Sequence, residues 1–313
     1  MSAGTYGTFV ALAAVVFSAS TAPVVKPILE GGSSLGAVMV IRMTGAALIL
    51  SPWLVRALIR NSRFFADHWL LIVTFGIAGV LGTQLFYLSA IQRLPVGVAL
   101  LIMNLAPVIL VARAWIATRH RPRWLVLSGT VISVMGLVVA ANVAGSGFDL
   151  LGVLLAIASA ACLATYFVAA EKAGHAVPPL ALTSGGLAVG ALATAALCGI
   201  GVMPFIIEPT TVEYGGISVL WLVAVGWIAF ITTSAGFGLG VVAVPLIGSR
   251  LASFIGLTEI LVASGFAWLL LNEAPDSAQV IGGGLILIGV ALIRAEPSSP
   301  EIPRGETSAA PSP

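Results

Sequence analysis

The chain alternates long apolar runs with short stretches rich in glycine, proline or polar residues. A helix needs about 20 apolar residues to cross a bilayer. Ten runs approach or exceed that length: 6–25, 35–55, 69–91, 95–117, 124–141, 150–170, 179–201, 217–239, 250–271 and 279–294. They are too long and too uniformly apolar for barrel strands. The pattern therefore predicts an all-α integral membrane protein with ten transmembrane helices.

The divisions between these runs carry turn residues, as in EGGSS at 30–34 and AGSG at 144–147. The least marked division is GVVAVPLIG at 240–248, between the eighth and ninth runs. This stretch is itself apolar, and only Pro245 and the glycines indicate a turn. We expect two spans there, with the chain reversing direction between them.

Composition excludes a soluble domain. Charged residues make up 8% of the chain and hydrophobic residues 59%, whereas soluble domains carry about 25% charged residues. The first apolar run has no Lys or Arg before it, which favours an uncleaved span over a secretory signal. The expected partners are the lipid bilayer and a small-molecule solute; nothing resembles a nucleic-acid-binding patch.

The positive charges predict the orientation of the chain. With the N-terminus inside, ten of the 14 Lys and Arg residues fall on the cytoplasmic side, Lys26 and Arg93 fall outside, and Arg42 and Arg113 lie within spans. Cytoplasmic loops carry the excess of Lys and Arg. We therefore expect a multi-pass cell-membrane protein with both termini cytoplasmic. The Pro- and Ser-rich segment 296–313 is predicted to be a disordered cytoplasmic tail.

The ten spans contain an internal repeat, which predicts two five-helix repeats over 1–145 and 146–295. Thr83, Gln84, Tyr87 and Pro95 align with Thr233, Ser234, Phe237 and Pro245. Gly129 and Gly136 of the fifth span align with Gly282 and Gly289 of the tenth. Because five is odd, the two repeats must be inverted in the membrane. Inverted repeats are typical of secondary transporters, whose substrate site lies near the bilayer midplane between the repeats.

The repeat resembles the EamA-type transporters of the drug/metabolite transporter superfamily. The resemblance rests on FYLSAIQRLPVGVALLIMNLAPVI in the first half and on SRLASFIGLTEILVASGFAWLLLNEAPDSAQVIGGGLILIGVALI in the second. It covers residues 5–294 and implies a transporter that exports a small metabolite, such as an amino acid. One departure is that TRHRPR at 118–123 stands where the second half has LNEAP, so any role of Glu273 is not duplicated.

Glu259 is the most distinctive candidate residue, because it lies near the middle of the ninth span without a charged neighbour in sequence. An intramembrane carboxylate usually marks function, either by binding a cation or by taking up a proton. The alternative is a neutral acid that is hydrogen-bonded to backbone. Its repeat counterpart is Pro107, a predicted helix break that frees the carbonyl of Met103. Asn104, one turn away, either contacts substrate or satisfies that loosened backbone.

Other candidate substrate-binding residues are polar or aromatic residues within spans. Each candidate has a structural alternative in helix packing, where small and polar side chains bond across helices. They are Gln84 with Tyr87 on one face of the third span, Ser234 with Phe237 on the eighth, Ser18 with Thr21 on the first, and Tyr166 on the sixth.

Two arginines lie inside spans. Arg42 has three interpretations: it binds a substrate carboxylate, it pairs with a loop acid such as Glu30 or Asp149, or it snorkels to the surface. Arg113 lies near the inner end of its span and is expected to snorkel.

The sequence thus predicts a secondary active transporter that works by alternating access. Coupling of transport to protons is one option. The alternatives are uptake or exchange of another small neutral or cationic solute, a channel or scaffold, and a membrane-embedded enzyme. No phosphate-binding loop or metal-ligand spacing occurs in the sequence, so we expect no cofactor and no metal. The glycines of the last span predict close helix contacts, within the chain or across a homodimer.

Overall fold

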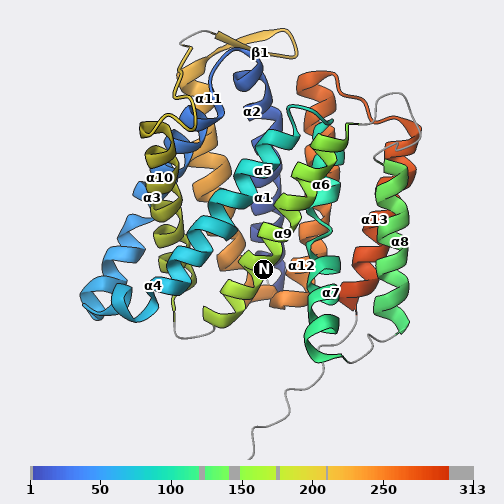
Figure 1. The fold of residues 1–313 in the computed structure, drawn as a ribbon, viewed down its shortest axis with the longest axis horizontal. Coiled ribbons are helices and arrows are strands. Elements are labelled where there is room, and N and C mark those ends of the chain that lie inside the picture. The colour runs from blue at the N-terminus through green and yellow to red at the C-terminus, as the bar shows by residue number, and fades with distance from the viewer. Residues whose placement is uncertain (1–2, 120–123, 141–148, 174–176, 209–210, 296–313) are drawn as a thin grey trace, which may run out of the picture.

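The structure is a computed structural model that describes residues 3–119, 124–140, 149–173, 177–208 and 211–295 (Figure 1). The predicted tail at 296–313 lies outside these residues. The elements are α1 (Ala3–Ala19), α2 (Thr21–Glu30), α3 (Leu35–Arg60), α4 (Phe64–Thr74), η1 (Phe75–Gly82), α5 (Thr83–Ala90), α6 (Val96–Met103), α7 (Ala106–Thr118), α8 (Trp124–Ala140), α9 (Leu150–Ala173), α10 (Pro179–Gly199), β1 (Thr211–Tyr214), β2 (Ile217–Leu220), α11 (Trp221–Trp227), η2 (Ile228–Ala235), α12 (Gly236–Leu271) and α13 (Ser277–Ala295).

The molecule is a bundle of helices, as expected of an integral membrane protein. Within the described residues, seven helical segments are long and apolar enough to cross a bilayer. Three shorter apolar helices accompany them, at Trp124–Ala140, Thr258–Leu271 and Ser277–Ile293. Figure 1 shows α2, α6 and the two strands at one end of the bundle and α4 and α7 at the other. We call these the hairpin end and the cavity end.

The strands were not predicted. They form an antiparallel hairpin in which Tyr214 pairs with Ile217 around Gly215 and Gly216. Both glycines have positive φ, 56° and 86°, which a tight hairpin turn requires and glycine tolerates. The sequence signal was TVEYGGISVL, two β-branched runs around Gly-Gly. Residues 217–220, predicted as the start of a span, belong to this hairpin.

The β1–β2 hairpin covers the ends of α2 and α12 at this end of the bundle. The Tyr214 hydroxyl donates to the Val24 carbonyl of α2 over 2.8 Å, and Gly215 N donates to Leu270 O of α12 over 3.0 Å. Burial raises the pKa of the Tyr214 hydroxyl above its ordinary value, because the ionised form would lose its hydration. The hairpin therefore ties α2 to α12.

Several spans are locally irregular. The first is interrupted at Ser20, between α1 and α2. The fourth is interrupted at Asn104 and Leu105, so that Pro107 is the second residue of α7. The third and eighth contain π-helical segments of eight residues each, η1 and η2. Such irregularities expose backbone groups or re-aim side chains and often occur at functional sites.

The helix α12 is long and reverses direction along α1. In its first part, Gly236 lies against Ser18, and Leu246 and Ile247 lie against Gly7. In its second part, Ile255 packs with Val15. At its end, Glu273 bonds to Lys26. Contacts therefore run down α1 and then back up, so the chain turns between Ile247 and Ile255. The predicted division at 240–248, with Pro245, lies inside α12 and does not end the helix.

The helices pack in two corresponding groups. The α1 group consists of α1, η2 and α12; the α9 group consists of α9, η1, α5 and α6. Two antiparallel pairs, α3 with α10 and α8 with α13, complete the bundle. In the second pair a Cβ at Gly129 would lie 2.6 Å from Gly289 O, and one at Gly136 would lie 2.7 Å from Gly282 O. Gly129 thus contacts the sequence counterpart of Gly136, and Gly136 contacts the sequence counterpart of Gly129.

Candidate functional site

Arg42 is buried in the interior and joins the two groups of helices. Its side chain extends from α3, and the residue is 3% exposed. Its Nε donates to Thr233 Oγ1 of η2 over 2.6 Å, and its Nη1 donates to Gln84 Oε1 of α5 over 2.8 Å. Thr233 belongs to the α1 group and Gln84 to the α9 group, so one guanidinium connects both.

The π-helical geometry of η2 orients Thr233. Its hydroxyl donates to Ile228 O, five residues back, over 2.9 Å. The Ser234 hydroxyl bonds in the same way to Ala229 O over 2.8 Å. Because the Thr233 hydroxyl proton is committed to its own backbone, the lone pairs of Oγ1 face the Arg42 guanidinium. Ser234, predicted to contact substrate, instead directs its hydroxyl proton to its own helix.

Among the described residues, Arg42 has no acidic partner. The two ion pairs there are Lys26 with Glu273 and Arg93 with Asp149. The suggested pairing of Arg42 with Asp149 is wrong, because the Asp149 carboxylate pairs with Arg93 over 3.2 Å. The suggested pairing with Glu30 and the snorkelling alternative are also wrong, since Arg42 bonds to interior side chains. A buried charge held by neutral groups favours an anion as a further partner.

Glu259 lies in the α1 group, on the second part of α12. Ser18 of α1 lies close to its carboxylate, and Glu259 is partly exposed. Ser18 Oγ also lies 3.2 Å from Val15 O, and the single hydroxyl proton can serve only one of these acceptors at a time. Glu259 therefore has a neutral partner and belongs to neither ion pair of the described residues.

Tyr87 lies near both Arg42 and Glu259. It is 5% exposed on α5, one turn from Gln84. Its hydroxyl lies within electrostatic range of Glu259 and of Arg42, and also of Glu273. The predicted residues Arg42, Gln84, Tyr87, Ser18 and Glu259 thus come together around the boundary between the two groups. We call this set, with Thr233, the central cluster.

The other predicted residues are placed differently. The Tyr166 ring packs on Phe75 of η1 at a centroid distance of 4.7 Å. The Asn104 amide nitrogen donates to Leu100 O over 3.0 Å, an oxygen that also accepts the Asn104 backbone N–H, and not to the Met103 carbonyl that Pro107 was expected to free. Thr21 is buried at 7% exposure at the start of α2. Phe237 is on α12, but its side chain lies outside the described residues.

Two residues that connect helices, Thr233 and Ser20, were not among the predicted site residues. Thr233 aligns with Thr83 in the repeat, and that alignment was the available signal. Ser20 accepts a hydrogen bond from Trp227 Nε1 over 3.1 Å, which links the interruption of the first span to the start of η2. Within the described part of the chain the buried Oγ1 of Thr83 has no hydrogen-bond partner, whereas Thr233 meets an arginine, so the two repeats differ here.

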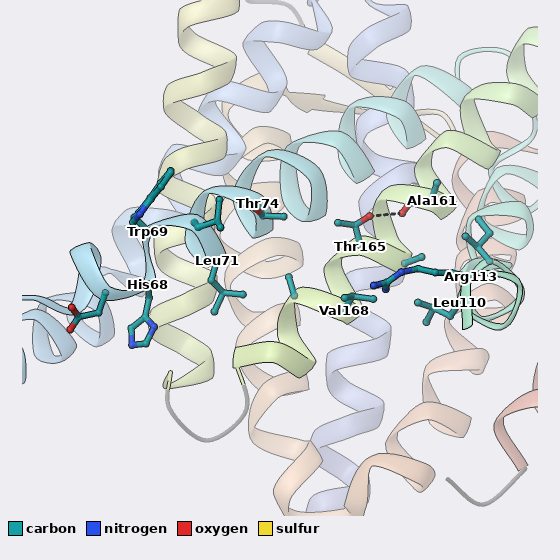
Figure 2. Close-up of a pocket in the computed structure, with 14 residues that line it drawn as sticks. His68, Trp69, Leu71, Thr74, Leu110, Arg113, Ala161, Thr165 and Val168 are labelled. Atoms are coloured by element: carbon teal, nitrogen blue, oxygen red, sulfur yellow. Dashed lines mark hydrogen bonds between the residues drawn. The ribbon is translucent and has the colours of Figure 1, made fainter. Parts of the chain in front are cut away.

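A half-open cavity of about 720 Å³ lies at the cavity end, between α4, α7 and α9. Its lining combines apolar side chains with Asp67, His68 and Arg113. Figure 2 shows Arg113 reaching from α7 toward Val168 of α9. None of the predicted substrate-binding residues lines this cavity, so it is a separate feature from the central cluster.

The fold and the central cluster define a helical membrane protein with a buried arginine and a partly exposed carboxylate near the boundary between two helix groups. The chain matches the EamA-like transporter family over residues 5–142 and 150–295, and it belongs to that family. The predicted resemblance is therefore confirmed, and the protein is a membrane transporter rather than an enzyme.

Several relatives carry informative names. The chain is 31% identical over 222 residues to the aromatic amino acid exporter YddG of Ancylobacter novellus, covering 69% of this chain and 73% of that one. It is 25% identical over 284 residues to a "probable terminal-alkyne amino-acid exporter" of Streptantibioticus cattleyicolor, covering 89% and 90%. A solved crystal structure matches with a TM-score of 0.60 at 22% identity over 92% of this chain and 96% of that one, which supports the fold alone.

Proposed function

We propose that the protein exports a small zwitterionic metabolite, such as an amino acid, by alternating access. The observation that carries this proposal is the arrangement of Arg42 and Glu259. Both opposite charges act electrostatically on Tyr87, and neither belongs to an ion pair of the described residues. A zwitterion would complement both at once, its carboxylate at Arg42 and its ammonium group at Glu259.

The proposed architecture is ten transmembrane helices in two inverted five-helix repeats. The reciprocal contacts of Gly129 with Gly289 and of Gly136 with Gly282 support it, because a two-fold relation produces such pairs. The π-helical segments support it as well, because η1 lies in the third span and η2 in the eighth, which the repeat pairs with each other. Seven long and three shorter apolar helices supply enough spans.

In the proposed orientation the hairpin end faces outward, both termini are cytoplasmic, and the protein lies in the cell membrane. The distribution of Lys and Arg supports this orientation. Solute would enter the central cluster from the cavity end and leave at the hairpin end. Proton coupling through Glu259 is part of the proposal, and so is a homodimer through the last spans. Among the described residues, no atom lies within 4 Å of the position that a Cβ at Gly284 of α13 would take, so this glycine would be available for a contact between protomers.

The proposal also draws on the exporter names of the relatives. The test is efflux from proteoliposomes loaded with single radiolabelled amino acids, aromatic and aliphatic, with and without an imposed pH gradient. We expect efflux of at least one amino acid well above that from protein-free liposomes. Absence of efflux for every amino acid, from protein that is folded by circular dichroism, would overturn the proposal.

A further inference from the structure

The hairpin end contains a junction at which one carboxylate connects three helices. Glu273 follows the end of α12. Its Oε1 accepts a hydrogen bond from Lys26 Nζ of α2, and its Oε2 accepts one from Val96 N at the first residue of α6, over 3.1 Å. Both side chains of the ion pair are largely shielded from solvent, with exposures of 13% for Lys26 and 23% for Glu273.

The two bonds of Glu273 have different consequences. Lys26 and Glu273 both adjoin the α1 group, so their ion pair holds the carboxylate in place within one unit. Val96 begins α6 of the α9 group, so the second bond crosses to the other unit. Val96 N is one of the N–H donors that a helix leaves unsatisfied at its start, and the positive end of the helix dipole favours a carboxylate there. Glu273 thus caps α6 from the opposite group.

The groups also meet closely next to this bond. A Cβ at Gly97 would lie 2.6 Å from Ser264 Oγ and 3.6 Å from Ser264 Cβ, so α6 and α12 are in close contact and a side chain there would require the Ser264 hydroxyl to rotate away. Glycine here allows the backbone of α6 to reach the side chain of α12. The hairpin end is therefore closed where the two groups meet.

The cavity end has no equivalent carboxylate in sequence. Where the second repeat has Glu273, the first repeat has TRHRPR at 118–123, and the half-open cavity of about 720 Å³ lies at that end. The bond between Glu273 and Val96 therefore acts on one end of the molecule alone.

We propose that Glu273 is the latch that holds the hairpin end closed, and that Lys26 positions its carboxylate. The inference rests on alternating access as the proposed function. Solute can leave at the hairpin end only when the bond from Val96 N to Glu273 is broken and α6 moves away from α12. Loss of the carboxylate then shifts the population of the protein toward a state open at the hairpin end, without altering the central cluster.

The first test measures opening and needs no substrate. In a variant with Cys162 and Cys198 replaced by serine, Ser264→Cys reports access from the hairpin end to a membrane-impermeant maleimide. Glu273→Ala is expected to speed labelling by about tenfold or more, and Lys26→Met to speed it by less, because the Val96 bond remains possible. The matched control is Asp149→Asn, which breaks the other ion pair at this end, within the α9 group.

The second test closes the latch covalently. The 3.6 Å separation between a Cβ at Gly97 and Ser264 Cβ suits a disulfide. Gly97→Cys with Ser264→Cys, in the same cysteine-free background, is expected to lose flux on oxidation and to regain it on reduction. The control is Gly82→Cys with native Cys162 and with Cys198 alone replaced by serine; this pair has the same 3.6 Å separation but lies within the α9 group, and its oxidation should leave flux unchanged.

Two results would overturn the latch. One is equal labelling of Ser264→Cys with and without the Glu273 carboxylate in variants of unchanged melting temperature. The other is undiminished flux through the oxidised Gly97 and Ser264 pair. Failure of the proposed function is distinguishable, because the labelling assay would still respond to Glu273→Ala while no amino acid would be transported.

Discussion

Arg42 Nη1 donates to Gln84 Oε1 over 2.8 Å, and this bond joins a buried positive charge to a neutral amide. The same guanidinium donates to Thr233 across the boundary between the two helix groups. A guanidinium in this position has donors for a further anion, and its neutral partners leave its charge uncompensated. The predictions below follow from this arrangement and from the packing around it.

Replacement of Arg42 is expected to weaken recognition of the substrate carboxylate. Arg42→Gln should lower amino acid flux by about tenfold or more, because a charge-assisted hydrogen bond is worth about 1.5–3 kcal/mol. Arg42→Lys should retain part of the flux, since it keeps the charge but loses the planar fork. The measurement is initial efflux from proteoliposomes over a range of substrate concentrations. Arg56→Gln, exposed on the same helix, is the control; equal flux in Arg42→Gln and wild type would contradict the assignment.

Glu259→Gln should abolish the response of flux to a pH gradient if the carboxylate carries a proton. It should lower flux at every pH if the carboxylate binds the ammonium group. The amide keeps an acceptor for the Ser18 hydroxyl, so the fold should be retained. Flux with and without the gradient separates the two roles, with the exposed acid Glu213→Gln as control. Wild-type flux with unchanged gradient dependence would show that Glu259 has neither role.

The contact between α8 and α13 should depend on glycine at defined positions. A Cβ at Gly282 would clash with Ala140 N and would lie 2.6 Å from Gly136 O, both backbone atoms that cannot move easily. Gly282→Ala should therefore lower the free energy of unfolding by about 1–3 kcal/mol, as overpacking does. Gly284→Ala on the same helix has open space around it and should be neutral. Unfolding in mixed detergent would measure both; equal stability of the two variants would refute this account of the contact.

The Tyr214 hydroxyl should contribute to the stability of the hairpin. Tyr214→Phe removes its hydrogen bond to Val24 O while the ring remains buried. The expected loss is about 0.5–1.5 kcal/mol of unfolding free energy. Hydrogen exchange of residues 211–220 should increase in the variant, and unchanged protection there would contradict the predicted contribution.

Asp149 predicts a dependence of stability on acid pH. Its Oδ1 accepts Gly152 N over 2.7 Å at the start of α9, and its Oδ2 pairs with Arg93 Nη1 over 3.2 Å. The Gly152 bond, with a smaller effect of Arg93, lowers the pKa of this carboxyl below its ordinary value. A lowered pKa in the folded state stabilises the fold above the unfolded pKa, and this stability is lost as the pH falls through the folded pKa.

The melting temperature of the wild type should therefore fall as the pH is lowered below about 4. Asp149→Asn keeps a side-chain acceptor for Gly152 N but does not titrate, so its melting temperature should fall less steeply over that range. Parallel pH profiles for the two proteins would exclude this contribution.

The apolar pattern predicted most of the fold, because spans are specified by local hydrophobicity. Gly129, Gly136, Gly282 and Gly289 were aligned from their spacing, and the structure brings them into reciprocal contact. The hairpin was missed because its TVEYGGISVL signal lies beside apolar residues that also read as the start of a span. The π-helical segments and the interruption at Ser20 carry no clear local signal, since they depend on packing against other helices.

The central cluster was predicted in part. Gln84 and Tyr87 were expected on one face of a span, but their proximity to Arg42 is a tertiary contact that sequence spacing cannot supply. For the same reason Arg42 was assigned to loop acids as one alternative, and Thr233 was passed over in favour of Ser234. Which of two neighbouring hydroxyls faces Arg42 depends on the π-helical turn, which the sequence did not reveal.

The most direct test of the central claim compares one amino acid with two of its analogues in proteoliposomes. Once a transported amino acid is identified, its methyl ester lacks the carboxylate and its deaminated acid lacks the ammonium group. We predict that wild-type protein transports the zwitterion at least about tenfold faster than either analogue, and that Arg42→Gln reduces the difference between the amino acid and its ester. Transport of the ester and the acid at the rate of the zwitterion would contradict recognition by Arg42 and Glu259.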